Sequence, residues 1–208
     1  MNAMDARERE ELERLIHEKW EQRDLASAAD AAIRGYGPEI YGFLVAFHRD
    51  DEDASEVWSR VTERLWAGLD RFGWQSSFRT WVYAIARNTS IRYRQEKKRR
   101  REEGLPEGSQ VDLAARLRTD TASWLRTSAR DRFAALRDSL PEDDRMLLVL
   151  RVDKDLAWND LARVMLPEDA GPLDEEGLKR EAARLRKRFQ HVKERLLELK
   201  RAIAAETQ

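Results

Sequence analysis

The chain has 208 residues, 38% of them charged, and a formal net charge of -1. The absence of cysteine excludes disulfides, thiolate metal sites and a cysteine nucleophile, and the three histidines lie too far apart in sequence to predict a metal site. No apolar run approaches the ~20 residues of a membrane span, and the charged N-terminus is unlike a secretion signal. These features predict a cytoplasmic protein, and the length and high charge favour two small helical domains.

Residues 1–24 are predicted to form an N-terminal charged helix. Along this segment runs a narrow apolar line of Leu12, Ile16 and Trp20, with charged residues on the other faces. So narrow a stripe predicts weak docking, either on another part of this chain or on a partner.

Residues 25–101 are predicted to form a first helical domain. Its opening segment is expected to break into two helices, because Gly35 and Gly37 interrupt the pattern and Pro38 suits the first turn of a new helix.

A further helix is predicted from Asp53 to Phe72, with apolar residues at helical spacing on one face. Trp66 lies at the flank of that apolar stripe. A tryptophan in such a place can anchor an interface, or it can be covered by the N-terminal helix. The polar face opposite the stripe includes Glu56, Ser59, Arg60 and Glu63.

The stretch from Gln75 to Arg101, QSSFRTWVYAIARNTSIRYRQEKKRRR, combines a core-facing side with a basic tail. Apolar residues recur at helical spacing in its first half. From Arg87 onward there are eight Lys or Arg residues and a single acid, in a chain with almost no net charge. Such asymmetry is typical of a surface that binds a polyanion.

The run from Leu69 to Arg100, LDRFGWQSSFRTWVYAIARNTSIRYRQEKKRR, resembles the promoter-melting region of extracytoplasmic-function sigma factors, the small two-domain members of the bacterial sigma-70 family. The likeness rests on a DRF helix end, a short polar loop, and SFRTWVYAIARN followed by basic residues. Separating promoter strands needs rings on which exposed bases can stack, beside cations that follow the phosphates. Rings are available here at Trp74, Trp81, Tyr83 and Tyr93.

The resemblance implies DNA-binding roles at particular positions. In the family, the loop that matches residues 73–77 holds a base flipped out of the minus-ten promoter element, and an asparagine that matches Asn88 helps to read it. The alternative is that Asn88 and the basic run belong to a solvated helix surface and that Trp81 lies in the core. The DNA-binding residues predicted in this domain are Trp74, Gln75, Ser76, Ser77, Trp81, Arg87, Asn88, Arg92, Lys97 and Lys98.

The resemblance also implies that the 53–72 helix docks on the clamp coiled coil of RNA polymerase. The segment DASEVWSRVTERL stands where relatives usually show a string like DAEDLVQEVFLRA. The usual acid is present as Glu56, but Ser59 replaces the usual glutamine. The polymerase-binding residues predicted on this helix are Glu56, Ser59, Arg60, Glu63 and Trp66.

Residues 102–120 are predicted to be a flexible linker, because glycine, proline and scattered charge interrupt the helical pattern. Residues 121–208 would then form a second domain that starts with a helix over 121–140. The string LPEDDRMLLVLRVDKDLAWNDLARVM, from Leu140, resembles the start of the family's C-terminal helix-turn-helix domain. The inward positions expected in its first helix are Trp158, Leu161 and Val164.

The end of the second domain departs most from the family, with a longer loop over 166–174 and a long helix after it. A heptad line on that helix is formed by Leu178, Ala182, Leu185, Phe189, Val192, Leu196, Leu199 and Ile203. We expect its later part to be covered from within the chain, by the 121–140 helix or the N-terminal helix, rather than by a second copy. Basic residues near its start are predicted to contact DNA, although a charged helix that packs only within its domain is the alternative: Lys179, Arg180, Arg184, Lys187 and Arg188.

Together these features predict an all-α protein of two small helical domains joined by a flexible linker, the second a helix-turn-helix domain. The resemblance implies a sigma factor that binds core RNA polymerase and promoter DNA, both double-stranded and melted, with an anti-sigma protein as a further partner. The sequence has no triad, carboxylate pair, metal cluster or phosphate-binding glycine loop that would indicate an enzyme, and we expect no cofactor, metal, membrane partner or small-molecule substrate. The alternative is a helix-turn-helix repressor or activator dimerised through the heptads. A helical scaffold would explain the charge but not the order of motifs.

Overall fold

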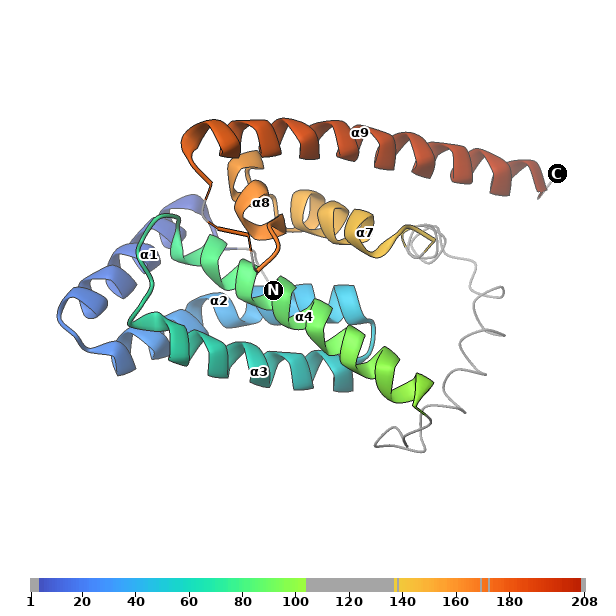
Figure 1. The fold of residues 1–208 in the computed structure, drawn as a ribbon. Coiled ribbons are helices and arrows are strands. Elements are labelled where there is room, and N and C mark those ends of the chain that lie inside the picture. The colour runs from blue at the N-terminus through green and yellow to red at the C-terminus, as the bar shows by residue number, and fades with distance from the viewer. Residues whose placement is uncertain (1–3, 104–136, 138, 169, 172, 207–208) are drawn as a thin grey trace.

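The computed structural model describes residues 4–103, 137, 139–168, 170–171 and 173–206, with side chains described up to residue 201. Within this part of the chain every regular element is a helix (Figure 1), which confirms the predicted all-α fold. No helix of the described residues is long and apolar enough to cross a membrane. Most of the predicted 102–120 linker and of the predicted 121–140 helix lies outside the described residues.

The N-terminal helix α1 (Ala6–Glu21) is part of the core rather than weakly docked. It starts with a capping box between Asp5 and Glu8, which satisfies backbone N–H groups that have no partner within the helix. Ile16 is fully buried. Leu12 lies so close to Gly35 that a Cβ at Gly35 would come within 2.3 Å of its side chain, so the missing side chain allows the close approach.

Helix α2 (Leu25–His48) runs unbroken, with Pro38 inside it. The predicted break at the Gly35–Pro38 segment is therefore wrong. A proline in a helix interior costs one backbone hydrogen bond and ~3 kcal/mol. Here the apolar stripe continues across the proline, since Tyr36 and Ile40 on either side of it are almost completely buried, and burying one continuous face offsets that cost.

Helices α3 (Asp51–Leu69) and α4 (Phe78–Glu102) complete the first half of the structure. The buried side chains of α3 follow the predicted stripe, and the helix ends at Leu69 rather than at Phe72. Ser77 caps α4, where its hydroxyl accepts a 3.1 Å hydrogen bond from the Thr80 backbone N–H.

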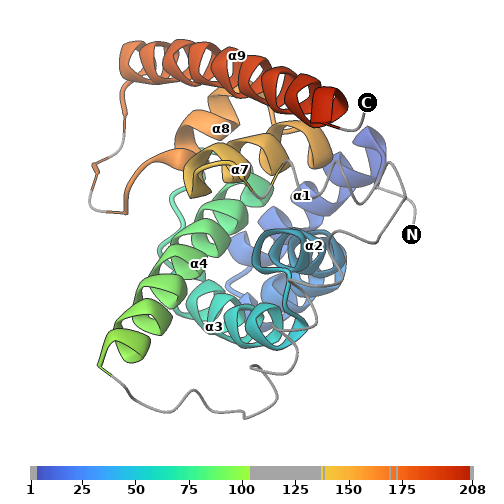
Figure 2. The ribbon, with the colours of Figure 1, turned by 90° about the vertical axis from the view of Figure 1, so that its right-hand side faces the viewer.

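The second half begins with α7 (Glu142–Leu148), which continues into the π-helical turn η2 (Val149–Asp153). Helix α8 (Trp158–Met165) and the long helix α9 (Glu175–Glu206) then follow, in the segment predicted to be a helix-turn-helix. Figures 1 and 2 show α7 and α8 lying between α4 and α9, and α8 packs against both of those helices. Buried apolar residues of both halves join in one continuous core.

The heptad seam of α9 is covered from within the chain, as expected. Its first part, from Leu178 to Leu185, belongs to the shared core. Further along, Val192 and Leu196 pack against Leu140 and Leu148, which precede and end α7. The cover therefore comes from around α7 and not from the N-terminal helix, and the side chain of Ile203 lies outside the described part.

Candidate functional site

The N-terminus of α4 is held by a carboxylate from α1. Oε2 of Glu13 accepts a 2.7 Å hydrogen bond from the Phe78 backbone N–H, and Oε1 accepts a 2.8 Å bond from that of Arg79. A negative charge at a helix N-terminus is stabilising, because the first N–H groups carry partial positive charge and have no partner within the helix. Sequence reasoning missed Glu13, since no local pattern reports a contact across 65 residues.

The loop before α4 is packed around Trp74. Its partly buried ring meets the His17 ring edge-on at a centroid distance of 4.3 Å and lies 4.8 Å from Phe72. The backbone at Trp74 is left-handed, with φ of 53°. Its indole Nε1 is buried and finds no hydrogen-bond partner in the described part of the chain. Of its neighbours in the loop, Gln75 and Ser77 are exposed.

Trp81 and Asn88 lie along α4 beyond this loop. The Trp81 ring stacks on Phe72 at 4.6 Å, so Phe72 joins Trp74 and Trp81 in one series of rings. Trp81 and Asn88 are both partly exposed, and the Asn88 side-chain carbonyl accepts a 3.0 Å bond from Arg87. The structure thus brings two of the four predicted rings, Trp74 and Trp81, together through Phe72. Tyr83 is fully buried and Tyr93 lies apart from them, where their hydroxyls donate to Glu39 and Asp53. The Asn88 amide NH2 has no hydrogen-bond partner among the described residues.

The second half of the chain covers part of this face of α4. Arg87 is only 8% exposed and donates a 2.9 Å hydrogen bond to the backbone carbonyl of Leu166. Arg92 forms a 2.7 Å ion pair with Glu168. Thr80 donates to Asp160 of α8 at 3.0 Å. Burial holds the pKa of Arg87 below its ordinary value.

Residues near the start of the basic tail are paired within the protein. Lys97 donates to Asp53 at 2.7 Å, and the Tyr93 hydroxyl donates to the same carboxylate at 2.6 Å. Burial tends to raise the pKa of Asp53, but these hydrogen bonds outweigh it and leave the pKa below its ordinary value. Lys98 is exposed, at 3.8 Å from Glu102.

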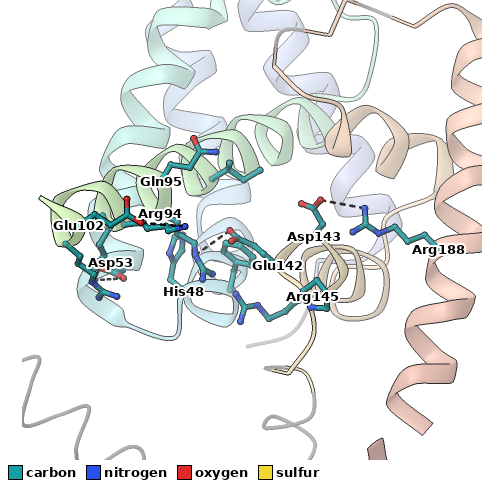
Figure 3. Close-up of a pocket in the computed structure, with 15 residues that line it drawn as sticks. His48, Asp53, Arg94, Gln95, Glu102, Glu142, Asp143, Arg145 and Arg188 are labelled. Carbon is teal, nitrogen blue, oxygen red and sulfur yellow. Dashed lines mark hydrogen bonds and ion pairs between the residues drawn. The ribbon is translucent and has the colours of Figure 1, made fainter. Parts of the chain in front are cut away.

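A cavity of about 930 Å³ opens between this tail and α7 (Figure 3). It brings Lys97 and Lys98 near Arg188 of α9, although these predicted DNA-binding residues are far apart in sequence. Burial lowers the pKa of His48 in its wall to about 4, so this ring is neutral at pH 7. Its lining carries both signs of charge. The cations are Arg94, Lys97, Lys98, Arg101, Arg145 and Arg188, and the acids are Asp53, Glu102, Glu142 and Asp143.

The predicted polymerase-binding residues lie on the outer face of α3. Glu56, Ser59 and Glu63 are exposed. Trp66 is 49% exposed, so the alternative that the N-terminal helix covers it is wrong. Arg60 is more constrained, because it bridges Glu56 at 2.9 Å and Glu96 of α4 at 2.8 Å.

The basic residues at the start of α9 divide into two groups. Lys179, Arg180, Arg184 and Lys187 are exposed, and Arg184 is paired with Glu181 on the same helix at 2.6 Å. Arg188 instead turns towards α7, where it pairs with Asp144 at 2.6 Å. Within the described ranges, no group of three or more His, Cys, Asp or Glu residues could hold a metal ion.

Comparison with known proteins places these features in one family. Residues 32–100 match the model of sigma-70 region 2. The chain is 30% identical over 150 residues to the RNA polymerase sigma-H factor of Pseudomonas aeruginosa, covering 69% of this chain and 78% of the relative. It is 28% identical over 133 residues to the ECF RNA polymerase sigma-E factor of Escherichia coli K12, covering 59% of this chain and 67% of the relative.

A solved structure is also similar, that of the sigma factor RpoE in complex with the anti-sigma factor NepR from Bartonella quintana. It matches with a TM-score of 0.48 at 18% identity, over 79% of this chain and 96% of that chain.

Proposed function

The chain belongs to the extracytoplasmic-function group of the sigma-70 family, and we propose that it docks on core RNA polymerase through α3 and opens promoter DNA with α4. As a sigma factor it serves transcription initiation, in a family of regulatory proteins rather than enzymes. The observation that carries the strand-opening proposal is the ring series of Trp74, Phe72 and Trp81 at the start of a helix that ends in cations.

The proposed polymerase surface is the outer face of α3. Glu56, Ser59 and Glu63 are exposed there, so the fold itself makes little use of their side chains. Trp66 adds a large half-exposed ring, and aromatic residues of this kind often supply much of the binding energy of an interface. Arg60 would contribute chiefly by orienting Glu56, with which it is paired.

The proposed promoter surface combines the 73–77 loop with the exposed part of α4. A base that leaves the duplex can stack on the partly exposed Trp81 ring, since stacking tolerates any base. Asn88 has an amide that can donate to a base edge while its carbonyl is engaged by Arg87. Lys97 and Lys98 lie further along the helix, where they can follow the phosphates.

The proposed contact with double-stranded promoter DNA uses the start of α9. Lys179, Arg180, Arg184 and Lys187 share an exposed surface directly after the helix-turn-helix loop. Arg188 is engaged by Asp144 and would have to leave that pair to reach DNA. An anti-sigma protein is a further proposed partner, on the ground of family membership.

The helix-turn-helix repressor dimerised through the α9 heptads is not favoured. Its dimer would need an open heptad seam, but Val192 and Leu196 are at most 9% exposed and pack on Leu140 and Leu148. The repressor hypothesis would also assign no function to the ring series of Trp74, Phe72 and Trp81.

Reconstitution with core RNA polymerase tests the proposal. We expect the protein to bind core polymerase, to direct transcription from a subset of random promoter fragments, and to make promoter thymines reactive to permanganate. Tight binding to duplex DNA without polymerase, together with no transcription, would support the repressor instead.

A further inference from the structure

We infer that Glu13 of α1 is a positioning residue for the promoter-reading loop at 73–77, a role that rests on the proposed function. The matched sigma-70 region 2 begins at residue 32, after α1 has ended. The structure nevertheless places α1 against both ends and the centre of the connection between α3 and α4, which contains this loop.

The strongest contact is made at the end of the loop. The Glu13 carboxylate accepts hydrogen bonds from two successive backbone N–H groups, those of Phe78 and Arg79, at 2.7 and 2.8 Å. Hydrogen bonds to an ionised acceptor are short and roughly twice as strong as neutral ones. Because the two N–H groups belong to the first turn of α4, Glu13 fixes where that helix begins and therefore where the loop must end.

A third hydrogen bond orients the carboxylate itself. The Tyr36 hydroxyl of α2 donates to Glu13 at 2.7 Å, and Tyr36 is only 1% exposed. Burial and the adjacent carboxylate hold the pKa of Tyr36 above its ordinary value, so its hydroxyl stays a donor. A side chain with three hydrogen bonds from two other helices has little freedom to move.

Other contacts of α1 act on the start and the centre of the connection between α3 and α4. The Trp20 indole N–H donates to the backbone carbonyl of Leu69, the last residue of α3, at 2.9 Å. The His17 ring packs edge-on against Trp74 at 4.3 Å. The whole connection between α3 and α4 is thus held by one helix.

Trp74 depends on such support. A bulky residue with a left-handed backbone is unfavourable, and so is a buried indole N–H without a partner in the described structure. Conformations of this kind persist only where many contacts from the surrounding structure hold them in place. A loop that must present a base-binding geometry also needs support of this kind, since small displacements weaken recognition.

The test compares Glu13→Gln with Glu10→Gln, an exposed glutamate on the same helix for which the structure shows no side-chain bond within the described residues. Each full-length variant is combined with core polymerase and a promoter library randomised in the minus-ten element. For Glu13→Gln we expect open complexes to fall about tenfold, with a flattened base preference at the positions the loop contacts, while affinity for polymerase changes less than about twofold. The Glu10 variant should behave as the unmodified protein does.

An independent measurement follows the Trp74 indole N–H signal by NMR in the free protein, assigned with Trp74→Phe. We expect this signal to shift or broaden in Glu13→Gln and to stay unchanged in Glu10→Gln. An unchanged signal, or a fall in opening with full base preference and matching losses of polymerase affinity and melting temperature, would overturn the positioning role. If the unmodified protein opens no promoter, the proposed function fails, and the NMR signal still decides whether Glu13 positions the loop.

Discussion

Arg92 of α4 and Glu168 of the loop after α8 form an ion pair with a separation of 2.7 Å. The same carboxylate lies 3.9 Å from Arg64 of α3. Two cations of the first half of the chain thus share one anion of the second half. Arg92 is among the residues proposed to bind promoter DNA, so its binding to a phosphate competes with this pair.

Replacing Glu168 with Gln should strengthen binding to promoter DNA. Both side chains of the Arg92 pair are about half exposed, so the pair contributes at most ~1 kcal/mol, and we expect at most about a fivefold gain in affinity. Fluorescence anisotropy with a labelled promoter fragment at several salt concentrations measures it. Glu10→Gln, on an exposed residue of α1 that pairs with no proposed DNA-binding residue, is the control, and unchanged affinity in both variants would show that the pair does not restrain DNA binding.

Substitutions at Asn88 should lower promoter opening with little effect on polymerase binding. Asn88→Ala loses the amide that donates to a base. We therefore expect the discrimination between the correct and a wrong base to fall by ~1–3 kcal/mol. Asn88→Asp keeps the oxygen that accepts from Arg87 but loses the NH2 group, so it should be as defective as the alanine variant. Permanganate reactivity of promoter thymines is the measurement. If the aspartate variant opens promoters normally, Asn88 acts only through its bond with Arg87.

The outer face of α3 gives a separate prediction for polymerase binding. Glu63→Lys and Trp66→Ala should weaken the complex with core polymerase. Glu63 is exposed, so Glu63→Lys should change the free energy of unfolding by less than ~0.5 kcal/mol. Trp66→Ala also loses the packing of a half-buried ring and should lower that free energy by about 1–2 kcal/mol. Competition with another sigma factor measures the affinity. Glu10→Lys places a similar charge on α1 and should compete normally. Equal affinity for all three variants would move the docking surface away from α3.

His48 gives the protein a stability that depends on pH. Burial lowers its pKa from 6.5 to about 4, and its Nε2 is hydrogen-bonded to the Ser90 hydroxyl at 3.0 Å. Between these pH values the unfolded chain binds a proton that the folded protein excludes, so stability is full above about pH 6.5 and falls as the pH drops towards 4. The loss from this residue is about 3 kcal/mol.

Urea unfolding of the unmodified protein and of His48→Gln between pH 4 and 7 measures this effect. Glutamine cannot take up a proton, so the variant should lose less stability on acidification. Identical slopes for both proteins would mean that His48 is protonated in the folded state.

Sequence periodicity predicted the elements whose stability is decided locally. The stripes of α3 and α9 follow from residue spacing, and the structure has them. The predicted break at Pro38 was wrong because it considered only the local cost of a proline in a helix. Tertiary packing, which buries one continuous face of α2, outweighs that cost.

Residues such as Glu13 and Glu168 could not be found from the sequence. Each joins elements that are far apart in the chain. In the sequence, such a glutamate cannot be told apart from the many solvent-exposed glutamates of a charged helix or loop. Trp74 was found, but its packing against His17 was not, since that contact depends on how α1 crosses the loop.

The position of α1 also bears on how the first half of the chain should be divided for experiments. A fragment that starts at residue 32, where the match to sigma-70 region 2 begins, would open inside α2 and lack Glu13, Ile16 and Trp20. It would present the face of Tyr36 to water and leave the N–H groups of Phe78 and Arg79 without the Glu13 carboxylate. The smallest autonomous folding unit of this half is therefore expected to begin at Asp5, and fragments cut at the family boundary should be insoluble or partly unfolded.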